Sequence, residues 1–343
     1  MPALLAALLL AAQQPGGAAE NWGSERSELT ASREYARSKA TCRRLGDPRP
    51  PAADQPGRAQ RQLLKSCDSQ KLYYGQGARP DYVRARQCAF IEADGADDEV
   101  FGGSTILMQV YANGLGATRN LDLATAYACN IDGAPAERDG RVNHLQDLKS
   151  KPSPKRFDYC DDITSGLAEG FCQSRDSDLQ AVGRDAKLGA LAARLPPAAR
   201  PLYAPMKRAF DAFVDLHGDG EVDLSGTARA MLVIQEEDAT RDAFTADLRR
   251  LLNGGWPAAT SAQAATADAA LNAAYREALA FTASKDNFST VKPDGIRKAQ
   301  RAWLAYRDAF QRFAAAASPR VGASAVAARL TAVRTKQLTD WTQ

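Results

Sequence analysis

The chain has 343 residues, of which 45% are hydrophobic and 25% are charged, with 44 basic against 41 acidic side chains. This length allows two or three domains, and the composition is that of a globular protein. The near balance of charge, without a basic stripe interleaved with aromatic residues, argues against nucleic acid as a partner. Alanine is abundant and β-branched runs are few, so we expect an all-α protein.

Residues 1–19 have the pattern of a signal peptide. An apolar stretch from Leu4 to Ala12 precedes the small residues Gly17, Ala18 and Ala19. The stretch is too short to cross a bilayer, which needs about 20 apolar residues. No Lys or Arg precedes it, so the alternative is an N-terminal helix that packs on the body. We expect a periplasmic or secreted protein with no membrane span after signal removal.

Six cysteines lie in the N-terminal half of the chain. No C-x-x-C occurs and the chain has two histidines, which argues against a zinc site or a redox centre. Three structural disulfides formed in an oxidising compartment fit best, and buried free thiols in a cytosolic protein are the alternative. Spacing does not give the pairing, although we favour Cys67 with Cys88 and Cys160 with Cys172. The candidates are Cys42, Cys67, Cys88, Cys129, Cys160 and Cys172.

A pattern repeats between residues 60 and 150. The stretches "YYGQGARPDYVRA" and "YANGLGATRNLDLA" place similar residues 39 positions apart, a period typical of stacked helical hairpins. The G-x-G of each stretch supplies positive φ at a turn, the polar residue caps the next helix, and the alanine allows close packing. The matched pairs are Gly75 and Gly114, Gly77 and Gly116, Asp81 and Asn120, and Ala85 and Ala124.

This pattern resembles the Sel-one-like repeat, a relative of the tetratricopeptide repeat. The resemblance implies α/α hairpins that bind other proteins or peptides, and the alternative is a scaffold held together by simple packing. We expect a Cys-containing helical-repeat domain at 25–150 and a disulfide-pinned connection at 151–176. A helical bundle follows at 177–343. Its expected helices lie near 179–194, 199–216, 225–252, 262–284, 293–316 and 320–342, and residues 205–252 resemble a diverged earlier copy of the unit that follows.

Three stretches near the C-terminus occur in a family-specific order. They are "ALNAAYREAL", "IRKAQRAWLAYRDAF" and "LTAVRTKQL", beginning at residues 270, 296 and 330. Together they resemble the N-terminal domain family of the lysozyme inhibitor LprI, which implies a helical bundle that binds and inhibits lysozyme. Many members carry a Cys after the Y-R-D, whereas Ala309 follows here, so this bundle must hold by packing. The matching residues are Leu271, Asn272, Tyr275, Gln300, Ala302, Trp303, Tyr306, Arg307, Asp308, Leu330, Thr331, Arg334 and Leu338.

Most of these motif residues are expected to be structural. Trp303 and Tyr306 are three apart on the apolar face of one helix and should lie in the core. Arg307 and Asp308 are adjacent and are not expected to pair with each other. We expect them to bond to neighbouring helices, for example Asp308 to Arg334, and contact with a ligand is the alternative.

Basic residues gather around the start of the same helix. Because lysozyme carries catalytic carboxylates in its cleft, basic side chains would favour its binding. We therefore expect a protein partner, possibly a lysozyme, and an interaction scaffold acting through the repeats is the alternative. The candidate partner-binding residues are Lys292, Arg297, Lys298 and Arg301.

Catalytic and metal chemistry find little support. Neither His144 nor His217 lies in a nucleophile-elbow context. Residues 215–226 follow part of a calcium-loop spacing, but Gly226 stands where a bidentate Glu is needed, so we interpret the segment as a Gly-rich turn. We expect a non-enzymatic protein without cofactor or metal. A hydrolase would require His144 or carboxylates gathered in one pocket.

Overall fold

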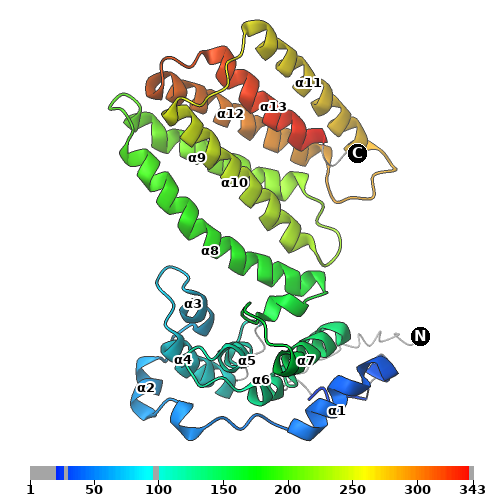
Figure 1. Ribbon diagram of the computed structural model, residues 1–343. Helices are drawn as coiled ribbons and strands as arrows, with labels where there is room; N and C mark the ends of the chain where they lie inside the picture. The colour runs from blue at the N-terminus through cyan, green and yellow to red at the C-terminus, as the bar shows by residue number, and fades with distance from the viewer. Residues whose placement is uncertain (1–20, 27–29, 96–99, 340–343) are drawn as a thin grey trace, which may run out of the picture. The chain divides into compact units, whose positions relative to one another are not determined.

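The computed structural model describes residues 21–26, 30–95 and 100–339, and every regular element in these ranges is a helix (Figure 1). The expected all-α class is confirmed. The expected signal peptide at 1–19 lies outside the described residues. The chain divides into unit 1, through Thr164, and unit 2, from Ser165. The first helix of unit 2 begins at Gly166, within the segment that we expected to be a connection.

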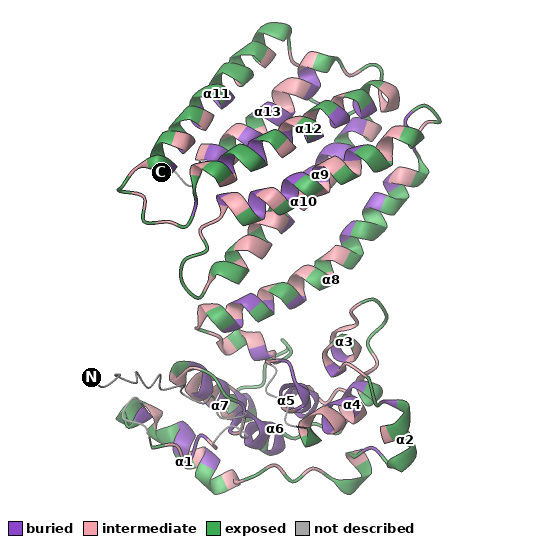
Figure 2. Cartoon of the chain, turned by 180° about the vertical axis from the view of Figure 1, so that it is seen from behind, coloured by how far each residue is buried: buried purple, intermediate pink, exposed green. Residues whose placement is uncertain are grey.

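Unit 1 is built of short helices. Besides 3-10 turns at Arg33–Tyr35, Ala52–Asp54 and Tyr159–Asp162, its elements are α1 Ala36–Leu45, α2 Arg58–Leu63, α3 Ser69–Tyr74, α4 Tyr82–Asp94, α5 Gly103–Asn113, α6 Leu121–Ala128 and α7 Pro135–Ser150. Consecutive helices from α3 to α7 pack against each other. Figure 2 shows that α5 and α6 are buried on nearly all sides. These two helices form the centre of unit 1.

The 39-residue repeat corresponds to two hairpins, α3–α4 and α5–α6, whose turns share one hydrogen-bond pattern. Helix α3 ends at Gly75, whose φ is 77°, and α5 ends at Gly114, whose φ is 68°. The amide of Gly75 donates to the carbonyl of Lys71, and the amide of Gly114 donates to that of Val110, 39 positions later. The turn chemistry expected from G-x-G is therefore present in both copies. Membership of the Sel-one-like family stays a prediction.

The predicted caps are also confirmed. The side chain of Asp81 accepts from the amide of Arg84 at the start of α4. In the same way, Asn120 accepts from the amide of Leu123 at the start of α6. An Asx side chain at this position satisfies an amide that has no partner within the helix. Each hairpin therefore carries its own start and stop signals.

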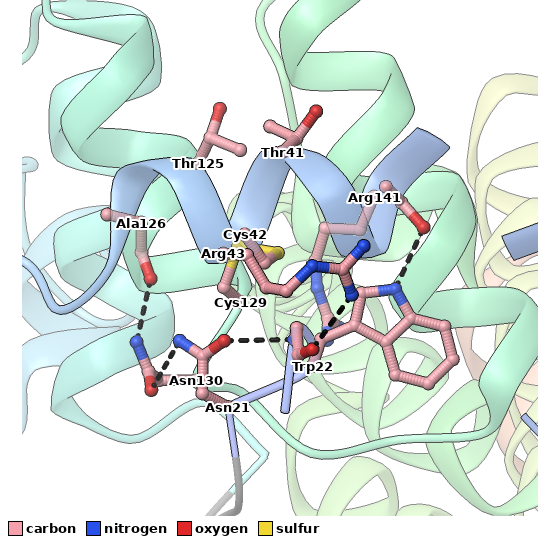
Figure 3. Close-up of a disulfide and its surroundings, with 12 residues drawn as sticks. Asn21, Trp22, Thr41, Cys42, Arg43, Thr125, Ala126, Cys129, Asn130 and Arg141 are labelled. Carbon is pink, nitrogen blue, oxygen red and sulfur yellow. Dashed lines mark hydrogen bonds between the residues drawn. A yellow bond between two sulfur atoms is a disulfide. The ribbon is translucent and has the colours of Figure 1, made fainter. Parts of the chain in front are cut away.

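Disulfides link elements of unit 1. Cys42 in α1 pairs with Cys129 at the end of α6 (Figure 3), and Cys67 pairs with Cys88, as predicted. Cys160 and Cys172 are also disulfide-bonded. All six cysteines are therefore oxidised.

The segment before α1 is also tied to the Cys42–Cys129 disulfide. The amide of Trp22 donates to the carbonyl of Cys129 at 2.8 Å, and its indole Nε1 donates to Ser38 Oγ at 2.8 Å. The Asn21 amide donates to the side chain of Asn130, as Figure 3 shows. Trp22 is fully buried. Asn21 and Trp22 therefore belong to the folded body of unit 1.

Unit 2 consists of six long helices, and the last three repeat the packing of the first three. Helix α9 packs against α12, while α8 packs against α10 and α11 against α13. Figure 2 shows that these helices are buried on one face only, as expected from their amphipathic sequences. The elements are α8 Gly166–Ala193, α9 Arg200–Glu221, α10 Arg229–Asn253, α11 Ser261–Ala283, α12 Pro293–Ala317 and α13 Ala323–Thr339.

Aromatic rings form the centre of unit 2. Phe210 stacks on Phe244 with ring centroids 4.2 Å apart, and Phe213 lies parallel to Tyr306 at 6.1 Å. Phe310 is fully buried beside them. No cysteine follows Cys172, so this packing takes the place of covalent bonds among α9 to α13. Removing one such ring typically costs about 3–5 kcal/mol.

Helix α9 continues beyond its predicted end at 216, through Glu221. The expected Gly-rich turn is therefore wrong over its first half. A Cβ at Gly218 would lie 2.8 Å from the side chain of Glu237, and one at Gly220 would lie 3.0 Å from the Cα of Gly295. These glycines lie inside α9, where the absence of a side chain allows neighbouring residues to approach the helix closely. Because Asp215 lies on the helix, the calcium-loop spacing does not form a loop.

Candidate functional site

The aromatic and aliphatic residues of the LprI-like motif lie in the core of unit 2. Leu271 and Trp303 are each 2% exposed and Tyr306 is 5% exposed. Burial raises the pKa of Tyr306 well above its ordinary value, so its hydroxyl stays protonated. Tyr275 is partly buried against the same core, whereas Asn272 is exposed and bonds to Asp268 of its own helix. These motif residues position helices α11 and α12.

Arg334 of the motif is fully buried and forms a bidentate ion pair. Its two terminal nitrogens donate to the carboxylate oxygens of Glu221 at 2.5 and 2.6 Å, and Nε donates to Gln300 Oε1 at 2.9 Å. The guanidinium also lies 5.3 Å from the ring centroid of Phe213. A fork-to-fork geometry of this kind is the strong form of an ion pair. It joins α13 to α9 and α12.

His217 extends this buried network. Its Nδ1 lies 2.6 Å from a carboxylate oxygen of Glu221, and its Nε2 lies 2.8 Å from Glu236. Burial disfavours the charged imidazole, but the hydrogen bonds with the two carboxylates outweigh it and raise the pKa of His217. Burial likewise acts to raise the pKa of Glu221, but the charge of Arg334 and the bonds to it outweigh burial and lower that pKa. The network therefore favours a protonated His217 beside an ionised Glu221.

Two predictions about the charged residues of the motif are wrong, one pairing and one absence of pairing. Asp308 does not bond to Arg334, because its side chain is half exposed while Arg334 faces α9 in the core. Arg307 instead pairs with its neighbour Asp308 through Nε and Nη2, at 3.0 and 2.9 Å. The long Arg307 side chain folds back over the ring of Trp303, 5.3 Å from its centroid, and this brings it to the adjacent carboxylate.

Glu221 and the structural role of His217 were not predicted from the sequence. A signal for both was present, since Phe210, Phe213, Val214, His217 and Glu221 follow one another at helical spacings of three and four. The glycines at 218 and 220 are typical of a turn, and this hid the helical spacing that continues through Glu221. Residues four apart lie on the same face of a helix, so Glu221 is expected beside His217.

The predicted partner-binding residues lie exposed at the start of α12. Lys298 pairs with Asp294 one turn earlier at 2.8 Å. Arg297 and Arg301 are one turn apart, and among the described residues neither has an acid within ion-pair distance. Lys292 Nζ donates to the carbonyl of Ser289, at 3.2 Å. This corner of unit 2 therefore presents cations available to an acidic partner.

Other groups that could support chemistry occur within each unit. In unit 1, His144 Nδ1 lies 3.0 Å from Asp162, and burial raises the pKa of that carboxyl. In unit 2, a cavity of about 200 Å³ between α8, α9 and α10 is lined by Arg184, Asp238 and the rings of Phe210 and Phe244. Two carboxylates line this cavity, Asp185 and Asp238, and Asp238 pairs with Arg184 at 2.9 Å. The hydrolase stays an alternative that these contacts do not test.

One group of potential metal ligands occurs among the described residues, formed by Cys67, Cys88 and Glu92. The two sulfurs are joined in a disulfide, so they supply no thiolate. Both carboxylate oxygens of Glu92 accept hydrogen bonds from Ser69. These contacts join α3 to α4, which gives the group a structural role.

The C-terminal helices are similar to one known protein family. Residues 256–338, which contain α11, α12 and nearly all of α13, match the family described as lysozyme inhibitor LprI. No curated protein and no solved structure matches the chain. Within the described ranges, no helix is long and apolar enough to cross a membrane. The resemblance seen in the three sequence motifs is thus supported for this segment.

Proposed function

We propose that this chain is an exported, non-enzymatic protein that binds and inhibits a lysozyme in the periplasm. The family matched by residues 256–338 is an inhibitor family. The oxidised cysteines fit a protein that folds outside the reducing cytosol. The buried motif residues build the scaffold, and the exposed residues of the same segment are left to contact the partner.

The observation that carries this proposal is the exposed basic cluster at the start of α12. Arg297 and Arg301 are exposed within the matched segment and, among the described residues, form no salt bridge, although their charges act on the nearby Asp294. Lysozyme cleaves its substrate between two carboxyl groups, so its cleft attracts cations. Complementary charge speeds association and is screened by salt. Inhibition should therefore be stronger at low ionic strength.

The test is a lysozyme activity assay with the oxidised, signal-free protein at low and high salt. We expect dose-dependent inhibition, and the double variant Arg297→Ala/Arg301→Ala should weaken it about tenfold at low salt and much less at high salt. The matched control is Arg312→Ala/Arg320→Ala, which removes the same charge from exposed sites toward the other end of α12. Absence of inhibition of any lysozyme at micromolar protein would reject the proposal.

A second candidate function is an interaction scaffold acting through the two hairpins of unit 1. Their shared hydrogen-bond pattern favours it, because repeated hairpins stack into surfaces that bind proteins. A fragment of residues 21–176 retains all six cysteines and is the appropriate bait. If this fragment retains a periplasmic partner that residues 177–343 do not, the scaffold function would be favoured over inhibition.

A further inference from the structure

The connection between α11 and α12, residues 284–292, carries the most exposed large hydrophobic side chain among the described residues. Phe288 is 93% exposed. Figure 1 shows this connection projecting beyond the adjoining ends of the two helices. A single exposed apolar residue is common on protein surfaces and by itself indicates nothing. The structure around Phe288 supplies the additional evidence.

The loop is held in one conformation by the residue before Phe288. The side-chain nitrogen of Asn287 donates to the carbonyls of Thr282 and Val291, at 3.2 and 2.9 Å. Its oxygen accepts from the amide and the hydroxyl of Ser289, at 3.0 and 2.6 Å. One amide group therefore ties both ends of the loop together and leaves Phe288 at the outside.

A second tether joins this loop to the turn after α9. Asp223 accepts from the amide and the hydroxyl of Thr290, at 3.0 and 3.1 Å, and Thr290 Oγ1 accepts from the amide of Leu224 at 2.6 Å. The hydrogen bonds from Thr290 and Ser225, led by the one from the Thr290 amide, lower the pKa of Asp223 to about 2. Val291, beside the tether, is 4% exposed. The base of the loop is thus anchored, whereas its tip, which carries Phe288, is exposed.

The stretch that carries Phe288 has a net positive charge. Residues 284–301 contain five cations and two acids, one of the acids, Asp294, is paired with Lys298, and the tether adds the carboxylate of Asp223 at Thr290. The amino end of α12, which begins at Pro293, adds the partial positive charge of a helix dipole. The cations are Lys285, Lys292, Arg297, Lys298 and Arg301.

We propose that Phe288 is the apolar anchor that enters the substrate cleft of a lysozyme, with the surrounding cations facing its catalytic carboxylates. This inference rests on the proposed function and names the element that performs it. A cleft that binds sugar rings accepts a flat aromatic ring, and an aromatic residue at the centre of an interface commonly dominates the binding energy. Because the two tethers order the loop before binding, little conformational entropy is lost on association. Occupation of the cleft would exclude substrate.

The experiment compares inhibition by full-length oxidised variants. Phe288→Ala should raise the inhibition constant about 30-fold or more, the range of a hot-spot residue. Phe288→Tyr, which keeps the ring, should stay within about threefold of the parent protein. The matched control is Leu63→Ala, because Leu63 in α2 is 84% exposed and lies in unit 1. Asp223→Ala keeps Phe288 but frees the loop, and should weaken inhibition about five- to tenfold.

A soluble chitin trisaccharide that fills the lysozyme cleft should displace the inhibitor in a direct binding measurement. Inhibition by the parent protein that is unchanged in Phe288→Ala would overturn the anchor and leave the proposed function standing. Binding that the trisaccharide does not affect would also overturn it. A parent protein that neither binds nor inhibits lysozyme would reject both, whereas loss in Phe288→Ala with competition by the sugar would establish the anchor.

Discussion

The two units of this protein achieve stability by different means. Unit 1 has helices of 6 to 16 residues and ties α1 to α6 and the α3 region to α4 with disulfides. Unit 2 has helices of 17 to 28 residues around an aromatic core, with a buried ion pair joining α9 to α13. Short helices bury less apolar surface each, so their loops gain more from covalent closure. Long amphipathic helices supply enough buried surface by packing.

The largest expected effect is the loss of stability of unit 1 when one of its disulfides is removed. Replacing Cys42 and Cys129 together by Ala opens a link between residues 87 apart and should destabilise unit 1 by about 4–5 kcal/mol. Removing Cys67 and Cys88, which are 21 apart, should cost about 3 kcal/mol. Hydrogen exchange read separately on α6 and α12 measures each unit. Equal loss of protection in α12 would show that the units do not differ in this way.

The next effect tests the buried ion pair of unit 2. Arg334→Met leaves Glu221 without its main cation in the core and should destabilise unit 2 by about 3–5 kcal/mol. Urea denaturation of full-length protein, followed by exchange in α12 and α13, measures the change. The double variant Glu221→Gln/Arg334→Met should recover part of it, because the buried charge is then gone. A double variant that is worse than the single one would contradict this account.

A smaller effect is the pH dependence that His217 gives to unit 2. Its pKa in the folded protein is raised, so its stabilisation is fully present below its unfolded pKa of about 6.5. The stabilisation is lost as pH rises through the folded pKa. Unit 2 should therefore resist urea better at pH 6 than at pH 9, and His217→Gln should flatten this difference. A parent protein with the opposite slope would mean that His217 is neutral when folded.

The smallest effect is expected at the exposed pair of the motif. Asp308→Asn removes the partner of Arg307, but the Asp308 side chain is half exposed. Exposed ion pairs contribute about 0–1 kcal/mol, so the free energy of unfolding should change by less than that. The same urea titration used for Arg334→Met checks it. A loss comparable to that of the buried pair would assign Asp308 a role beyond this surface contact.

Local patterns allowed much of the helical layout to be predicted. The caps at Asp81 and Asn120 and the start at Pro293 are each encoded by a residue type that suits one backbone position. The spacing of Trp303 and Tyr306 indicated their burial. These features depend on neighbours within a few residues along the chain, so the sequence alone determines them.

Long-range partners were decided by the tertiary structure. Glu221 meets Arg334 across 113 residues, and Asp223 meets Thr290 across 67. No sequence spacing encodes such contacts, because they arise where two helices or loops cross. The same holds for Gly220, whose place inside α9 follows from the close approach of Gly295. The sequence by itself determined the helices and their buried faces, whereas packing decided which charges are buried together and which loop stands exposed.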